Sequence, residues 1–406
     1  MDADYRFFHR RTIRELIKSC RTEQVKNHFS ERVFITRIFY FVAVVFPLNV
    51  ESKSLKYYFQ RFLEYSATAY LIICILGDLK SLLGIAWLIP AGLTFSTIFT
   101  AFFSITIRLT VLYKRQDIFL LMVYLQDILS GLQLEKHASQ RYQLIFGTCI
   151  CYVLPAVLFW FTISLCFPGS ERVLSFYVQG IFFGWSSRNK WTNCAVFVIC
   201  DHFIVNQQHI LSGLLIVLCW YLLGLLRRII ASFEVVTERK CDLDSLFNFY
   251  VEYSSTISRC KALSEQALSL LLLFLYGFMV FSVFNVTTFL MATNLAKYPM
   301  SMVTNQMAVL SVTVTGFYFM TFQAVAVHDA AIKVKNVVHE MVSSSDSSDY
   351  ELKYLILTLV SEFPSHVVVS GWGLFSLRRR FLAQITSGMF TYAVLLIQMG
   401  NQNVRK

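Results

Sequence analysis

A row of polar and small side chains follows one face of the last apolar segment, which we predict to be a helix from Arg378 to Gln402. The row advances by four, three, four, three and four residues, which is the α-helical period, and it consists of Gln384, Gly388, Thr391, Leu395, Gln398 and Gln402. Amides and hydroxyls on an apolar helix face acyl chains only at a high free-energy cost, so they need water or a partner helix. Two interpretations follow: a small-residue seam for helix packing, or the wall of a pore that several copies share.

A second group of polar side chains lies at the start of the fourth apolar segment. Within Asp201-His202 and Asn206-Gln207-Gln208-His209, the candidate ligand contacts are Asp201, His202, Asn206, Gln207 and His209. A few hydrogen-bonding groups among aromatic side chains are typical of a small-molecule pocket between helices. The alternative is a helix start satisfied by capping and water, with Asp201 near the positive end of the helix dipole.

Other reactive residue types form no catalytic or metal-binding pattern. His328 and Asp329 are adjacent, so on a helix their side chains point about 100° apart, and no nucleophile motif accompanies them. We expect them to form a solvated helix end. The 10 cysteines show no CxxC pair and no histidine partners. We therefore predict no catalytic residues, no metal site, no cofactor and a protein that is not an enzyme.

The composition is that of a polytopic membrane protein. Hydrophobic residues make up 56% of the chain, charged residues 15%, and the mean hydropathy is +0.56. The formal net charge is +11, but the basic residues lie between apolar segments. They therefore indicate membrane topology and contact with lipid headgroups, and we expect no binding to nucleic acid.

We predict an all-α membrane protein with seven transmembrane helices. Each apolar stretch is long enough to cross a bilayer, and the stretches cover residues 57–79, 85–112, 142–167, 201–230, 266–293, 302–328 and 379–400. An eighth stretch, Val33 to Val50, has only nine uninterrupted apolar residues. We interpret it as a re-entrant or interfacial segment.

The distribution of lysine and arginine predicts the orientation. The segments on one side of the predicted spans carry 28 of these residues and those on the other side carry 7, with Arg61 inside the first span. The positive-inside rule then gives a cytoplasmic N-terminus and an extracellular C-terminus. We divide the chain into a basic cytoplasmic arm and interfacial segment (1–56), six spans with the ligand pocket (57–328), a cytoplasmic loop and anchor helix (329–378), and a pore-lining helix with an outer tail (379–406).

This topology argues against two common classes of membrane protein. A G-protein-coupled receptor has its N-terminus outside, and the chain has neither its Asp-Arg-Tyr nor its Asn-Pro-x-x-Tyr motif. A secondary transporter usually shows repeated halves, and none is visible. The longest outer segment holds or borders Cys166, Cys194 and Cys200. A disulfide among them suits an oxidising exterior, and the alternative is buried free thiols.

The last third of the chain carries motifs that can be compared with a known family. The run from Thr391-Tyr392 to Gln398, a Thr-Tyr followed by five apolar residues and Gln, resembles the closing signature of the insect gustatory receptors. Gly371-Trp372-Gly373-Leu374-Phe375 resembles the family's approach to its last helix, and Leu246 to Leu273 resembles the pattern leading into the fifth span. Met399 stands where that family usually has an aromatic residue. The related insect odorant receptors therefore remain an alternative.

The resemblance implies a ligand-gated, non-selective cation channel in the plasma membrane. In such a channel four identical or related subunits each place their last helix around one pore, and a small-molecule tastant binds within each subunit. Thr391, Tyr392 and Gln398 would be the signature residues, and the Gln398 amides would replace part of a cation's hydration. A seven-span receptor that signals through a cytoplasmic partner, and a subunit that needs a co-receptor, are further alternatives. The sequence does not identify the ligand.

Overall fold

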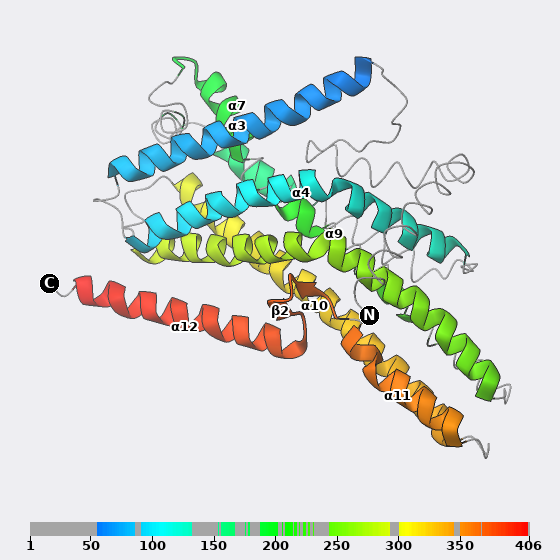
Figure 1. Ribbon diagram of the computed structural model, residues 1–406. Coiled ribbons are helices and arrows are strands. Elements are labelled where there is room, and N and C mark those ends of the chain that lie inside the picture. The colour runs from blue at the N-terminus through cyan, green and yellow to red at the C-terminus, as the bar shows by residue number, and fades with distance from the viewer. Residues whose placement is uncertain are drawn as a thin grey trace.

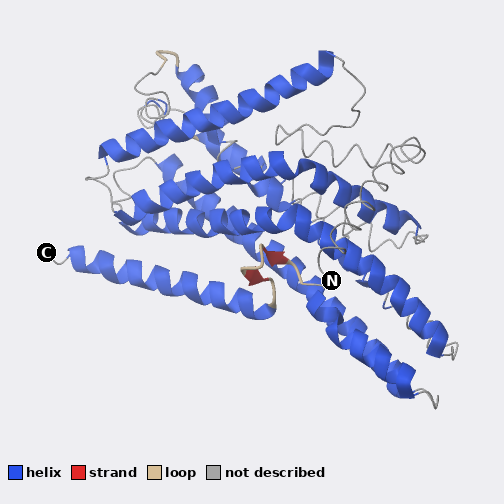
Figure 2. Cartoon of the chain, in the orientation of Figure 1, coloured by secondary structure: helices blue, strands red, loops and turns tan. Residues whose placement is uncertain are grey.

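The computed structural model describes residues 55–85, 91–131, 187–201, 243–292, 300–344, 350–366 and 368–404, with shorter pieces within 153–178 and 205–230. These residues are almost entirely helical, as the sequence predicts (Figures 1 and 2). The elements in order are α3 (Leu55–Ile85), α4 (Ala91–Gly131), α7 (Lys190–Asp201), α9 (Leu243–Ala292), α10 (Met300–Ser344), α11 (Tyr350–His366), β1 (Ser370–Gly371), β2 (Phe375–Ser376) and α12 (Arg379–Val404).

Three described segments are long and apolar enough to cross a membrane: Thr94–Ile118, Ser258–Met291 and Met300–Ser343. They match the predicted second, fifth and sixth spans, and a shorter apolar segment, Glu64–Gly77, falls in the first. The predicted spans 142–167 and 201–230 are described only in part, and the segment 33–50, predicted to be interfacial, lies wholly outside the described residues.

Two helix ends differ from the prediction. The second span was predicted to begin at residue 85, but α3 continues to Ile85 and α4 begins at Ala91. The helix of the sixth span does not end at His328, because α10 continues to Ser344. Apolar side chains on that extension, including Val334 and Val338, are buried in the core. Hydropathy shows where an apolar stretch ends, whereas a helix continues as long as one of its faces is packed.

The core forms where α4 packs along α9 and where α10 packs against α9 (Figure 1). The α4–α9 seam is aromatic: the rings of Phe99 and Phe281 stack with centroids 4.8 Å apart. Gly277 lets the helices approach, since a Cβ built there would lie 2.6 Å from the Phe103 ring. This close seam makes α4 and α9 the scaffold for the other helices.

A buried ion pair joins α3 to α4. The Arg115 guanidinium donates to both carboxylate oxygens of Glu64, at 3.0 and 3.3 Å, and the Glu64 side chain is 2% exposed. The buried Arg108 donates to the Thr68 hydroxyl at 3.3 Å. Buried charges need such partners, because an isolated charge in an apolar environment is very unfavourable.

A short hairpin connects α11 to α12, and the sequence analysis did not predict it (Figure 2). β1 and β2 are antiparallel, with Ser370 opposite Ser376 and Gly371 opposite Phe375. At the turn, Trp372 and Gly373 both have positive φ, of 50° and 73°. Two consecutive left-handed residues are the mark of a tight hairpin turn. The turn reverses the chain so that α12 can run back beside the bundle.

Candidate functional site

The terminal helix α12 is attached to the rest of the chain along one face. Its 26 residues span about 39 Å at 1.5 Å per residue, enough for a hydrocarbon core of about 30 Å. Phe381, Leu382, Ile385 and Met389 pack against the core. The ring of Phe381 stacks on Phe375 of the hairpin, with centroids 4.8 Å apart and planes 12° apart. The hairpin therefore sets where α12 begins.

Three polar contacts hold α12 to α9 and α10. Near its start, Arg379 donates to the Asp329 carboxylate at 2.8 Å, so Asp329 is paired and does not form the simple solvated end that we expected. About two turns further, the hydroxyls of Thr386 and Tyr318 are 2.9 Å apart. The Tyr392 hydroxyl lies 2.9 Å from that of Thr288. These contacts lie along the side of α12 that faces the bundle.

The polar row lies on the other side of α12 and faces away from its own chain. Gln384, Gly388, Thr391 and Leu395 are all exposed, and Leu395 is 51% exposed. A Cβ built on Gly388 would meet nothing within 4 Å. The backbone of Gln398 and Gln402 belongs to α12, but their side chains lie outside the described residues. The four described members form no seam with the described helices of the same chain.

The signature pair Thr391-Tyr392 divides between these two faces. The Tyr392 ring lies 4.2 Å from the Phe284 ring of α9, measured between centroids. The Thr391 hydroxyl is exposed and donates to the Ser387 carbonyl one turn earlier at 2.9 Å, so it has a partner even without water. Adjacent helical residues point about 100° apart, and here that angle separates an anchoring residue from an outward-facing one.

Two of the predicted ligand contacts can be located, and they have different partners. Asp201 accepts a hydrogen bond from the Thr162 hydroxyl at 2.7 Å. It is the last residue of α7, so our alternative of a carboxylate at the positive start of a helix is wrong. The His209 Nε2 lies 3.3 Å from the Thr313 hydroxyl of α10. His202, Asn206 and Gln207 fall outside the described residues.

His209 belongs to a buried polar cluster that also contains Gln208, which we did not select from the sequence. Gln208 donates to the Ser104 hydroxyl of α4 at 2.8 Å. Gln208 is 0% and His209 1% exposed, yet Gln208 Oε1 and His209 Nδ1 have no hydrogen-bond partner in the described part of the chain. An unpaired buried polar atom costs about 1–3 kcal/mol. Gln208 Oε1 and His209 Nδ1 are therefore available to form hydrogen bonds with a small molecule or with water.

Gly316 of α10 packs beside this cluster. A Cβ built there would lie 3.8 Å from the Ser212 hydroxyl and 3.9 Å from His209 Nδ1. The edge of the Phe278 ring faces the His209 ring, with centroids 6.4 Å apart. Because α4, α10 and the 208–212 helix segment meet here, only their packing reveals that Gln208 points inward beside His209.

The cysteine alternatives are resolved by a disulfide between Cys166 and Cys194, whose Cα atoms are 5.5 Å apart. Cys200 takes no part in this disulfide and lies buried beside Cys74. Within the described ranges, no group of histidine, cysteine or acidic side chains is arranged to hold a metal ion.

No protein-family model and no curated protein sequence matches the chain. A solved structure of the olfactory receptor OR5 from Machilis hrabei matches 91% of this chain and 98% of its own, with a TM-score of 0.68 and 15% sequence identity. The chain has the fold of an insect olfactory receptor. A second OR5 structure, in complex with eugenol, matches with the same TM-score, the same coverage and 14% identity. At 14–15% identity, these two matches show the fold alone.

Proposed function

We propose that the chain is a subunit of a ligand-gated, non-selective cation channel of the insect chemoreceptor type. In this proposal four copies in the plasma membrane bring their α12 helices together around one pore. The observation that carries it is the open face of α12: Gln384, Gly388, Thr391 and Leu395 are exposed on the side that the bundle leaves uncovered. The olfactory-receptor fold of nearly the whole chain supports the same class.

The energetics of that face favour assembly around water. An amide or hydroxyl left against acyl chains costs several kcal/mol in an apolar medium, so bringing four rows together around an aqueous axis removes the cost. Phe390, 71% exposed and about 120° around the helix from the row, suits lipid or a neighbouring subunit. Leu395 would then be the apolar constriction of the closed state, and a ring of Gln398 amides would pass partly dehydrated cations.

We assign ligand binding to the buried polar cluster. Gln208 Oε1 is a free acceptor, and His209 Nδ1 accepts or donates according to its tautomer. A small uncharged organic molecule with a hydroxyl group would satisfy both atoms, and the neighbouring Phe278 ring would cover its apolar part. The olfactory receptor of the same fold was solved with eugenol bound. Binding opens the channel only if the cluster holds the ligand more tightly in the open state.

The test is to express the chain in a heterologous cell and to record ligand-evoked currents. We expect Leu395→Ala to raise the resting current by weakening the apolar constriction, and Gln398→Ala to alter single-channel conductance. The control is Phe390→Ala, an exposed apolar position away from the row, which should leave conductance unchanged. Unchanged conductance and gating in both row variants would defeat the pore assignment.

A gustatory receptor remains our first choice, because of the signature in α12. An odorant-receptor subunit is the second candidate, because Met399 stands where the gustatory family usually has an aromatic residue. Screening the expressed channel with dissolved tastants and with volatile compounds distinguishes them.

Recording the chain alone and with related subunits shows whether it needs a co-receptor. An N-terminal epitope tag that antibodies reach without permeabilisation would overturn the proposed orientation and favour a receptor that signals through a cytoplasmic partner.

A further inference from the structure

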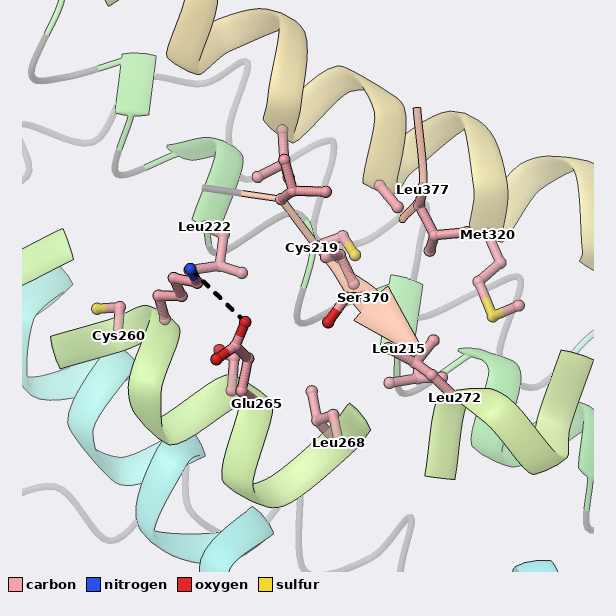
Figure 3. A pocket seen from close by; sticks show the side chains of 16 residues that line it. Leu215, Cys219, Leu222, Cys260, Glu265, Leu268, Leu272, Met320, Ser370 and Leu377 are labelled. Carbon is pink, nitrogen blue, oxygen red and sulfur yellow. Dashed lines mark ion pairs between the residues drawn. The ribbon is translucent and has the colours of Figure 1, made fainter. Parts of the chain in front are cut away.

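A cavity elsewhere in the bundle shares no lining residue with the buried polar cluster. It is lined by α9, α10, the 215–222 segment and the β1–β2 hairpin, it is partly open to the surface, and the space in it that admits water measures about 50 Å³ (Figure 3). Most of its wall is apolar, as shown by Leu215, Leu222, Leu268, Leu272, Met320 and Leu377.

One wall of this cavity is the connection to α12. Val368, Val369, Ser370 and Leu377 flank or belong to the hairpin and line the space. The Leu377 amide donates to the Val369 carbonyl at 2.9 Å, which closes the hairpin base. Phe375, from the same hairpin, stacks on Phe381 in the first turn of α12. A molecule in the cavity would therefore contact the β1–β2 hairpin, which fixes the position of the first turn of α12.

The polar atoms of the cavity define the chemistry of its ligand. The Ser264 hydroxyl lines the cavity and is buried, and it has no hydrogen-bond partner among the described residues. Among the described lining residues, Lys261 and Glu265 are the charged ones, and they form an ion pair at 3.6 Å (Figure 3). Their charges cancel, so neither an anion nor a cation finds an unpaired opposite charge. One free hydroxyl in an apolar wall matches a neutral molecule with one hydrogen-bonding group.

We propose that this cavity binds a small uncharged amphiphile, an alkanol-like molecule whose single hydroxyl meets Ser264, and that the occupant modulates opening through the hairpin. The binding claim stands without the proposed channel function, whereas the modulation claim rests on it. Under the predicted orientation the cavity lies toward the cytoplasmic end of the bundle, where an amphiphile dissolved in the inner leaflet would reach it.

Binding is tested on the purified full-length protein with a photoreactive octanol that carries a diazirine. We expect cross-links on peptides spanning 260–272 or 368–377, and competition by n-octanol. Ala324→Leu, which fills a lining position, should abolish this labelling. Ser264→Ala should weaken competition by n-octanol about 2- to 10-fold, the range expected for one lost hydrogen bond. The matched control is Ser269→Ala, because Ser269 is not among the lining residues and its hydroxyl bonds the Glu265 carbonyl.

Labelling that persists in Ala324→Leu would overturn the proposal, as would labelling of these peptides only by a phosphatidylcholine with a diazirine on its acyl chain. The second result would mean that the cavity takes a lipid tail.

In a conducting channel, n-octanol should shift the ligand concentration for half-maximal current in the wild type and not in Ala324→Leu. Binding without this shift would refute modulation alone, and absence of any current would refute the channel proposal while leaving the binding result valid.

Discussion

The hydroxyl groups of Thr288 in α9 and Tyr392 in α12 lie 2.9 Å apart and join the terminal helix to the bundle. The Tyr392 ring also lies 4.2 Å from that of Phe284. This contact is more than three turns along α12 from the Arg379–Asp329 pair at its base. If the terminal helices separate when the channel opens, the contact between Thr288 and Tyr392 is the one that must change.

We therefore expect Tyr392→Phe to shift the gating equilibrium while the packing of the ring persists. Loss of one hydrogen bond, worth about 0.5–1.5 kcal/mol, should move the half-maximal ligand concentration about 2- to 10-fold. The double variant Thr288→Val, Tyr392→Phe should shift it less than the sum of the two single effects. Tyr354→Phe, at a 75% exposed position of α11, is the control and should leave the curve in place. Strict additivity of Thr288→Val and Tyr392→Phe would show that the hydrogen bond does not contribute to gating.

The buried ion pair between α3 and α4 gives a prediction on stability. Glu64→Gln removes one charge and leaves the Arg115 guanidinium only 17% exposed. Removing one partner of a buried pair costs about 3–5 kcal/mol, so the melting temperature of the purified protein in detergent should fall clearly. Lys114→Gln breaks the more exposed pair with Asp117 and should cost no more than about 1 kcal/mol. Equal melting temperatures for Glu64→Gln and the wild type would show that the pair contributes little.

Two glycines predict opposite outcomes for the same substitution. Gly277→Ala places a Cβ 2.6 Å from the Phe103 ring, and such overpacking costs about 1–3 kcal/mol. Gly388→Ala meets nothing within 4 Å and should preserve or slightly raise stability, because alanine favours a helix. If Gly388 faces the pore, its alanine variant should nevertheless change the current. Thermal melts together with single-channel recordings check both parts, and a destabilised Gly388→Ala of normal conductance would contradict the account.

A disulfide joins Cys166 to Cys194, and the predicted orientation would place it on the outer side of the membrane. Cys166 and Cys194 enclose a loop with a sequence separation of 28, and closing such a loop is worth about 3–4 kcal/mol. Cys166→Ser and Cys194→Ser should each lower the melting temperature, and the double variant should be no worse than either one. A maleimide-polymer gel shift before and after reduction counts the thiols. A wild-type thiol count that reduction does not change would contradict the disulfide.

The sequence predicted those features that depend on one helix alone. The period of the row from Gln384 to Gln402 requires only a single helical backbone, and four of its members are indeed exposed. The predicted start of the last span at residue 379 is also the start of α12. The charge count predicts orientation in the same way, from the chain itself, and orientation stays a prediction.

Features that depend on two or more elements could not be predicted in this way. Gln208 differs from its polar neighbours only because Ser104 lies opposite it in α4. Asp329 looked like a solvated helix end because its partner, Arg379, is 50 residues away in sequence. The hairpin was hidden as well, because a strand of two residues has no periodicity to detect. The apolar cavity beside it arises only when four separate segments meet.

The pore assignment is tested most directly by measuring the water accessibility of α12 in the assembled, open channel. Cysteine is introduced at Thr391 or Leu395 in the row and, as a control, at Phe390, and a charged methanethiosulfonate reagent is applied during ligand-evoked current. The account predicts rapid modification and block at Thr391→Cys and Leu395→Cys, and none at Phe390→Cys. Modification of Phe390→Cys with the two row positions left unmodified would contradict it.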